Sequence, residues 1–226
     1  MYKIFITNDI APEAKQLLEK NFEIHVEPNM TEEELCKVIG NYDALITRSQ
    51  TKVTRKVIDA ARRLKVIGRA GVGVDGIDIP AATARGIIVV NTPEANTIAA
   101  AEHTIALMLG MTRQIPQAHQ SIMEGRWDRK SFMGIQLLNK TVGIIGVGRV
   151  GSNVAKRLQA FDMNTIGYDP YIPEERGRQL GVKLVDLDTL LAQSDYITLH
   201  VPLTEETRSL IGSDAIGKMK TGVRIV

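Results

Sequence analysis

Three glycines with a short, fixed spacing give the clearest sign of chemistry in this 226-residue sequence. Gly146, Gly148 and Gly151 form the pattern G-x-G-x-x-G between an apolar run, Thr141–Ile145, and a helical pattern, 152–161. In a strand–loop–helix unit, the first glycine permits a tight turn and the second lets the backbone approach a pyrophosphate. The third lets helix and strand pack closely. The pattern therefore predicts a site for the phosphates of a dinucleotide.

Residues around the glycines strengthen that interpretation. Arg149 and Val150 stand at the start of the following helix, whose free N–H groups and positive dipole end favour phosphate. Asp169 follows the next predicted strand, at roughly the 20-residue distance where a carboxylate accepts the two ribose hydroxyls. The bare glycine pattern is a weak signal, since such glycines can serve a tight turn alone. The surrounding strand, helix and carboxylate favour dinucleotide binding.

Asp169 also bears on the choice of cofactor. Its negative charge would repel the 2′-phosphate of NADP. The next residues, Pro170 and Tyr171, offer no cation to receive that phosphate. We therefore expect the cofactor to be NAD.

Two arginines follow predicted strands in the first half of the chain. Arg48, with Ser49 beside it, comes after the strand Ala44–Thr47, and Arg69 begins a glycine-containing loop, 69–75. Ligands bind at the carboxyl ends of parallel strands, and guanidinium groups match anionic oxygens geometrically. Both arginines are therefore anion-binding candidates. The alternatives are solvated surface charges and a helix-starting turn without a ligand.

Histidine and metal chemistry receive less support. His200 ends a predicted strand and faces the expected crevice, whereas His25, His103 and His119 are expected at the surface or in structural roles. With one cysteine and no H-x-x-x-H or C-x-x-C spacing, no metal site is predicted.

Short apolar runs alternate with helical patterns along the sequence, which predicts an α/β fold with parallel sheets. Strands are predicted at 3–7, 22–26, 44–47, 64–67, 87–90, 141–145, 165–168, 182–185, 196–201 and 223–226, and helices at 12–20, 31–39, 54–61, 96–112, 114–124 and 152–161. The run 87–90 is apolar throughout, which predicts a strand covered by helices on both faces. We expect two domains, residues 1–94 and 95–226.

The composition excludes several classes of protein. Apolar residues make up 44% and charged residues 24%, as in globular domains. The net charge of +2 is too small to favour nucleic acid or a membrane surface as partner. The single Cys36 forms no internal disulfide, which indicates a reducing compartment. No signal peptide or spanning segment is recognised, and we expect a cytoplasmic protein.

Taken together, these motifs resemble the D-2-hydroxy-acid dehydrogenase family. The resemblance is carried by 68–75, 91–103, 113–116 with 125–127, and the glycine loop through Pro170. It implies a flavodoxin-like substrate domain, here 1–94, and a Rossmann-type doubly wound NAD-binding domain, here 95–226. The family builds its substrate domain from an N-terminal segment and a C-terminal return. We expect the NAD-binding domain to lack its last strand.

The resemblance also implies roles for particular residues. The loop Arg69, Ala70, Gly71, Val72 and Gly73 would offer N–H groups to a substrate carboxylate, with Val72 also facing the cofactor. Relatives often carry a hydroxyl residue at position 72 and Asn at position 76, where this chain has Val72 and Gly76. A substrate phosphate would bind Arg48 and Arg69, beside Ser49. The segment His200, Val201 and Pro202 would line the adenosine end of the NAD site, in preference to His200 acting as a base.

The implied activity is oxidation of a D-2-hydroxy acid, with 3-phospho-D-glycerate as the expected substrate. The family's catalytic Arg, Glu and His are expected beyond Val226, so no residue of 1–226 is assigned a catalytic role. Alternatives are enzymes acting on glycerate, glyoxylate, lactate or formate, and a non-catalytic NAD-binding module like the corepressors that share this fold. The family pairs through the helices 96–112 and 114–124, which implies a homodimer or homotetramer with Ile98, Ile105, Leu109 and Ile115 near the contact.

Overall fold

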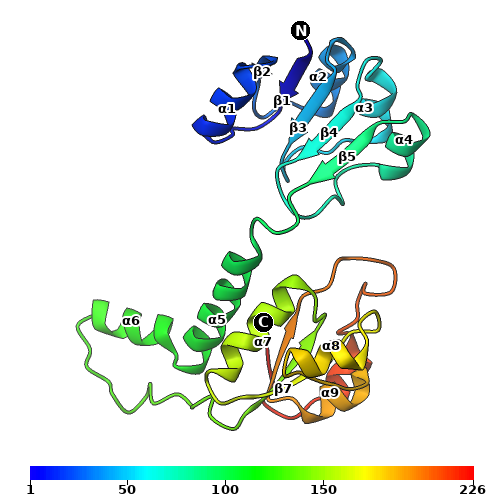
Figure 1. Ribbon diagram of the computed structural model, residues 1–226. Coiled ribbons are helices and arrows are strands. Elements are labelled where there is room, and N and C mark those ends of the chain that lie inside the picture. Colours follow the sequence, from blue (N-terminus) through cyan, green and yellow to red (C-terminus); the bar gives the residue numbers. More distant parts are fainter. The chain divides into compact units, whose positions relative to one another are not determined.

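The computed structural model describes all residues, 1–226, and divides the chain into two compact units, Met1–Asn96 and Thr97–Val226 (Figure 1). Each unit holds one five-stranded parallel sheet. The sequence placed the boundary between residues 94 and 95. None of the helices combines the length and the hydropathy that crossing a membrane requires.

The first unit is a parallel sheet in the order β2-β1-β3-β4-β5. Its strands are β1 (Lys3–Ile6), β2 (Glu23–Val26), β3 (Ala44–Thr47), β4 (Val66–Arg69) and β5 (Ile88–Asn91). Its helices are α1 (Pro12–Glu19), α2 (Glu32–Val38), α3 (Arg55–Ala60) and α4 (Ile79–Ala84), with a 3-10 turn at Ile39–Asn41. This strand order is that of flavodoxin-like folds, as predicted.

Helix starts in this unit follow local capping chemistry. The Thr31 hydroxyl accepts from the Glu34 N–H at 3.3 Å, and the Glu34 carboxylate accepts from the Thr31 N–H at 2.9 Å, forming a capping box for α2. Asp78 caps α4 by accepting from the Ala81 N–H at 2.9 Å. The cap at Thr31 explains why the predicted helix start at 31 agrees with the structure.

The expectation for the run 87–90 is wrong in one respect. The strand forms as β5, but Ile88 is 61% exposed and Val90 is 50% exposed, whereas Val89 packs on the core. β5 is the edge strand of the sheet and pairs only with β4. Within this unit only the face of β5 that carries Val89 is packed against other residues. An apolar run indicates that both faces of a strand can be buried. It does not show which helices or other elements bury them.

The second unit contains the strands β6 (Thr141–Ile145), β7 (Asn164–Tyr168), β8 (Lys183–Leu184), β9 (Tyr196–Leu199) and β10 (Arg224–Ile225). Its helices are α5 (Thr97–Thr112), α6 (Ile115–Met123), α7 (Arg149–Gln159), α8 (Glu174–Gln179), α9 (Leu187–Gln193) and α10 (Ser213–Gly217). The order β10-β9-β6-β7-β8 is that of the first five strands of the doubly wound dinucleotide-binding fold, with β6 at the centre.

Helix α5 packs along α7 in this unit (Figure 1). Ile105 and Met108 of α5 are buried in the same cluster as Val154 and Leu158 of α7, and Leu109 packs against that cluster. Ile105 and Leu109 therefore face the core of their own unit, which corrects the expectation that they lie at a subunit contact.

The amino ends of both sheets are held by an aspartate in the same way. The Asp43 carboxylate accepts from the backbone N–H of Lys3, the first residue of β1, at 2.9 Å. The Asp195 carboxylate accepts from the backbone N–H of Thr141, the first residue of β6, at 2.8 Å. Each aspartate immediately precedes a strand that pairs with that first strand. The hydrogen bond from Lys3 lowers the pKa of Asp43, and the Arg63 guanidinium at 3.2 Å adds to the effect.

We predict that Asp43→Ala destabilises the first unit by about 1–3 kcal/mol near neutral pH, because the Lys3 N–H loses its acceptor. The native pKa of Asp43 is lowered, so its stabilisation is complete above the unfolded value, about 3.9, and is lost as pH falls through the native value. Urea unfolding of wild type and variant should therefore converge in acid. Asp9→Ala, at an exposed carboxylate, is the control. An equal difference at pH 7 and pH 2 would contradict the assignment.

Candidate functional site

The predicted glycine loop joins the central strand β6 to α7. Gly146 has a positive φ of 87°, and a Cβ there would lie 2.6 Å from the carbonyl oxygen of His200. A Cβ at Gly151 would overlap the carbonyl oxygen of Gly146. The fold itself therefore requires these two glycines, one for the turn and one for the approach of helix to strand.

Gly148 differs from its two neighbours in the motif. A Cβ there would meet no atom within 4 Å, so the packing of the protein does not require glycine at this position. Gly148 is the N-cap residue of α7, and no side chain caps this helix end. Open space beside an uncapped helix N-terminus fits the approach of a pyrophosphate to the backbone.

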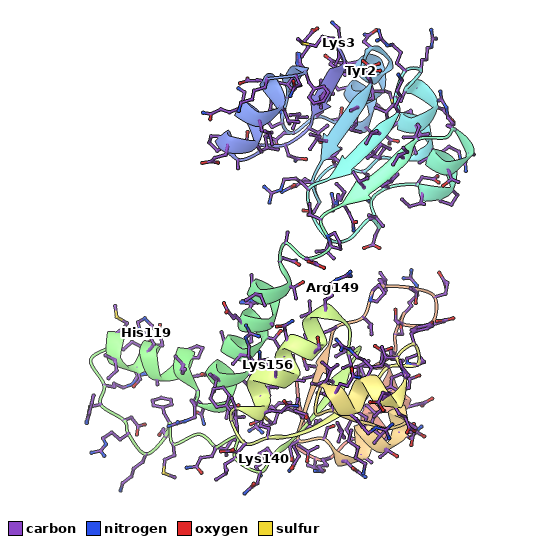
Figure 2. All side chains as sticks on the ribbon, viewed as in Figure 1. Tyr2, Lys3, His119, Lys140, Arg149 and Lys156 are labelled. Atoms are coloured by element: carbon purple, nitrogen blue, oxygen red, sulfur yellow. The ribbon has the colours of Figure 1, made fainter.

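The two residues after Gly148 take different positions. Arg149 is exposed at the amino end of α7 (Figure 2), whereas Val150 is half-buried and packs on the core of the unit. A role for Val150 in binding phosphate would therefore lie with its backbone N–H.

Asp169 follows β7, the strand next to β6, and its carboxylate is fixed on both sides. One oxygen accepts from the Val147 N–H of the glycine loop at 2.9 Å, and the other accepts from the Tyr171 N–H at 3.0 Å. Each carboxylate oxygen has further lone pairs, so the group can still accept from ribose hydroxyls. The loop and the acidic residue are thus held as one structure.

A pocket of about 270 Å³ opens beside these residues, at the carboxyl ends of β6, β7 and β9. It brings together six predicted cofactor residues, which are Gly146, Gly148, Asp169, His200, Val201 and Pro202. It is also lined by Ile145, Tyr168, Pro170, Tyr171, Thr204, Glu206, Thr207 and Leu210. Open α/β sheets bind nucleotides in such a crevice, on either side of the strand that carries the glycine loop.

His200 lies on the wall of this pocket. Its Nε2 atom is 2.9 Å from the hydroxyl oxygen of the buried Thr198. Burial disfavours the charged imidazolium and lowers the pKa of His200 to about 4. The ring is therefore neutral at pH 7, where it can exchange hydrogen bonds but adds no positive charge to the pocket.

Eight lining residues were not among the predicted site residues, namely Ile145, Tyr168, Pro170, Tyr171, Thr204, Glu206, Thr207 and Leu210. A signal existed for two of them, since Thr-x-x-Thr is a reciprocal turn pattern. The Thr204 N–H donates to the Thr207 hydroxyl at 2.8 Å, and that hydroxyl donates to the Pro202 carbonyl at 2.6 Å. These bonds fix the loop that lines one side of the pocket.

The anion-binding candidates of the first unit lie at the carboxyl ends of two paired strands. Thr47 of β3 is in register with Arg69 of β4, and the Ala70 N–H donates to the Thr47 carbonyl at 2.9 Å. Arg48 and Ser49 are exposed just after β3. The structure thus brings Arg48 and Arg69 to the same edge of the same sheet.

Arg69 shows an unusual arrangement. Its Nε–H donates to the Gly73 carbonyl at 2.9 Å, whereas its Nη1 atom is buried without a hydrogen-bond partner. The loop that it braces is also held by Asn91, whose amide donates to the Val72 carbonyl at 2.7 Å. A buried, unpaired guanidinium nitrogen is costly, so this nitrogen leaves Arg69 with a hydrogen-bond donor that the unit does not satisfy.

Asn8 is a further residue that sequence reasoning missed. It is buried after β1, and its side-chain oxygen accepts from the Arg48 N–H at 2.8 Å. Its amide donates to the side chain of Gln50 at 3.3 Å. The signal was its place directly after a strand, the same signal that singled out Arg48.

The predicted residues therefore form two groups, one in each unit. Val72, expected to touch both substrate and cofactor, belongs to the first unit, where it is 38% exposed. No set of three or more His, Cys, Asp or Glu side chains in the chain is arranged to hold a metal ion.

With this geometry established, comparison with known proteins identifies the class. Residues 105–226 match the family described as D-isomer specific 2-hydroxyacid dehydrogenase, NAD binding domain. This match covers more than half of the chain, and the chain belongs to that family. The family's cofactor is NAD, which agrees with the glycine loop, the open space at Gly148 and the carboxylate of Asp169.

Curated relatives extend the similarity to the whole chain. It is 56% identical over 225 residues to the D-3-phosphoglycerate dehydrogenase of Archaeoglobus fulgidus and 53% identical over 227 residues to that of Methanocaldococcus jannaschii. These alignments cover 99% and 100% of this chain, respectively. The chain spans 43% of the length of each relative.

Solved structures show the same architecture. A glyoxylate reductase from Paecilomyes thermophila matches 99% of this chain and 72% of its own, with a TM-score of 0.90 and 34% identity. The apo-structure of D-lactate dehydrogenase from Escherichia coli matches 99% of this chain and 72% of its own, with a TM-score of 0.82 and 31% identity.

We predict that alanine at two glycines of the loop affects different properties, NAD binding at Gly148 and stability at Gly151. Gly148→Ala should leave the melting temperature unchanged, since its Cβ meets open space. It should raise the Kd for NAD about tenfold or more, because the methyl group obstructs the pyrophosphate. Gly151→Ala should lower stability by about 1–3 kcal/mol, because its Cβ overlaps the Gly146 carbonyl. Thermal unfolding and calorimetric NAD titration separate the two. Unchanged NAD affinity in Gly148→Ala would contradict the assignment of Gly148.

Proposed function

We propose that this chain forms part of a D-3-phosphoglycerate dehydrogenase, which oxidises 3-phospho-D-glycerate to 3-phosphooxypyruvate for L-serine biosynthesis in the cytoplasm. The observation that carries the proposal is the 56% identity to a protein of that name over nearly the whole chain. A second line of support is the pair Arg48 and Arg69, two cations beside a loop in which residues 70, 72 and 73 are exposed. Phosphate and carboxylate groups on one small substrate need such a set of donors.

In this proposal the second unit binds the cofactor. The glycine loop and the amino end of α7 hold the pyrophosphate, and Asp169 accepts hydrogen bonds from the ribose hydroxyls. Bound NAD supplies the hydride acceptor. Because Asp169 is negative and the pocket is lined by no Lys or Arg, a 2′-phosphate would find no cation there.

The first unit binds the substrate. The loop Arg69, Ala70, Gly71, Val72 and Gly73 receives the carboxylate, through N–H groups other than those of Ala70 and Gly71, which already donate to the Thr47 and Arg69 carbonyls. Arg48 binds the phosphate, with Ser49 beside it. Asn8 holds the Arg48 backbone through its 2.8 Å hydrogen bond.

Proton transfer is assigned to groups outside residues 1–226. A general base works best with a pKa near the working pH, and His200, with a pKa of about 4, is a weak base at pH 7. His200 is assigned instead to the wall of the adenosine end, with Val201 and Pro202.

The full-length protein should oxidise 3-phospho-D-glycerate with NAD and prefer it to D-glycerate, D-lactate and glycolate. Arg48→Ala should raise KM for the phosphorylated substrate about tenfold to a hundredfold, the range of one charge-assisted hydrogen bond. The KM for D-glycerate, which has no phosphate, should stay unchanged. Arg62→Ala, an exposed arginine on another loop, is the control. Preference for an unphosphorylated acid would favour another member of the family. NAD binding without turnover of any 2-hydroxy acid would favour a corepressor-like module.

We also propose that the protein pairs through α5, α6 and the segment after α6. Support comes from apolar side chains left exposed there, including Leu107 at 50%, Ile115 at 54%, Ile122 at 51% and Trp127 at 78%. Ile98, at 47%, belongs to the same set. Large apolar side chains left exposed on neighbouring elements are typical of protein–protein interfaces.

Light scattering of the full-length protein should give at least a dimer at micromolar concentration. Ile122→Asp should shift it toward monomer, because a charge at a buried contact is costly. Gln117→Asp, which adds the same charge to another exposed position of α6, should leave the assembly intact. A strictly monomeric wild type would refute the pairing.

A further inference from the structure

Tyr171 is an aromatic residue outside the cores of both units. It is 79% exposed and lines the cofactor pocket, two residues after Asp169. A large ring left this accessible in a ligand pocket is available to a ligand rather than to the fold.

Hydrogen bonds fix both ends of this residue. Its backbone N–H donates to the Asp169 carboxylate at 3.0 Å, and its hydroxyl donates to the Glu206 carboxylate at 2.8 Å. Residues 169–171 follow β7 and residue 206 lies in the loop after β9, and these two strands flank β6 in the sheet. The pair therefore connects the two loops on either side of the glycine loop. The bond to Glu206 also raises the pKa of Tyr171, since it holds the proton on the phenol.

The surroundings of Tyr171 identify the part of NAD that reaches it. The glycine loop receives the pyrophosphate and Asp169 receives the adenosine ribose, so the adenine lies beyond Asp169, away from the pyrophosphate. Val201, Pro202 and Leu210 supply apolar surface to the same pocket. A flat aromatic base enclosed by apolar side chains and a phenol ring is the ligand group that suits this space.

We propose that Tyr171 stacks on the adenine of bound NAD, and that Glu206 is the positioning residue that holds the phenol ring in place. This inference deepens the cofactor assignment and rests on it. Stacking suits this position, because an aromatic ring packs on the face of a base whatever hydrogen bonds the edge of the base makes. Tyr171 thereby contributes affinity for the adenosine half and none for the nicotinamide half.

The test uses the full-length protein and two ligands, NAD and ADP-ribose, which contains the adenosine half without nicotinamide. Tyr171→Ala should raise the Kd of both by the same factor, about tenfold, the size of one base stacking on an aromatic ring. Tyr171→Phe, which retains the ring and loses the hydroxyl, should raise both only about two- to fivefold.

Variants of Glu206 separate positioning from charge. Glu206→Ala should raise the Kd of ADP-ribose about two- to fivefold, because the phenol loses its acceptor. Glu206→Gln should restore wild-type affinity, since its side-chain oxygen still accepts from the hydroxyl. An equal loss in both variants would overturn the positioning role.

Two matched controls lie outside the pocket. Tyr2→Ala removes another exposed tyrosine, in the first unit (Figure 2), and Glu205→Gln neutralises the carboxylate next to Glu206. Both should leave the Kd of ADP-ribose unchanged. If wild type binds both ligands and Tyr171→Ala binds them equally well, stacking is refuted while the cofactor assignment stands. If wild type binds neither ligand, the cofactor assignment fails as well.

Discussion

The close approach of Gly151 to the carbonyl of Gly146 is the contact on which the cofactor site depends. It brings the first turn of α7 onto the end of β6, at a distance that no side chain at position 151 would allow. As a result, the N-terminus of α7 lies at the carboxyl edge of the sheet, with Gly148 as its N-cap residue. The Asp169 carboxylate is anchored to the same loop through the Val147 N–H, so the groups expected to bind phosphate and ribose are fixed relative to each other.

The two units apply the same construction to different chemistry. In each, an aspartate holds the first strand at the amino edge, and functional candidates gather at the carboxyl edge of a parallel sheet. The second unit presents backbone N–H groups, a carboxylate and apolar side chains, which suit a dinucleotide. The first presents Arg48 and Arg69, which suit small anions. The difference lies in the loops after the strands, which is where α/β folds place their ligand-binding residues.

Features set by short sequence distances were predictable. The glycine loop and Asp169 sit next to recognisable strands, so their positions followed from the pattern. The wrong expectations concerned what covers an element: Ile88 and Val90 are exposed, and Ile105 faces α7. The hydrogen bonds that join Tyr171 to Glu206 and Asn8 to Arg48 were not predictable, because they connect residues 35 and 40 positions apart and no sequence periodicity indicates them.

Calorimetric titration of the full-length protein with NAD and NADP tests the central claim, that this pocket binds NAD through Asp169. We expect wild type to bind NAD more tightly than NADP. Asp169→Ala should raise the Kd for NAD about tenfold or more, because the ribose hydroxyls lose a charged acceptor. The Kd for NADP should stay unchanged or fall, because the carboxylate no longer repels the 2′-phosphate. Asp169→Asn, which retains an acceptor for the Val147 N–H, separates loss of charge from loss of loop structure. Equal affinities of wild type for NAD and NADP would contradict the account.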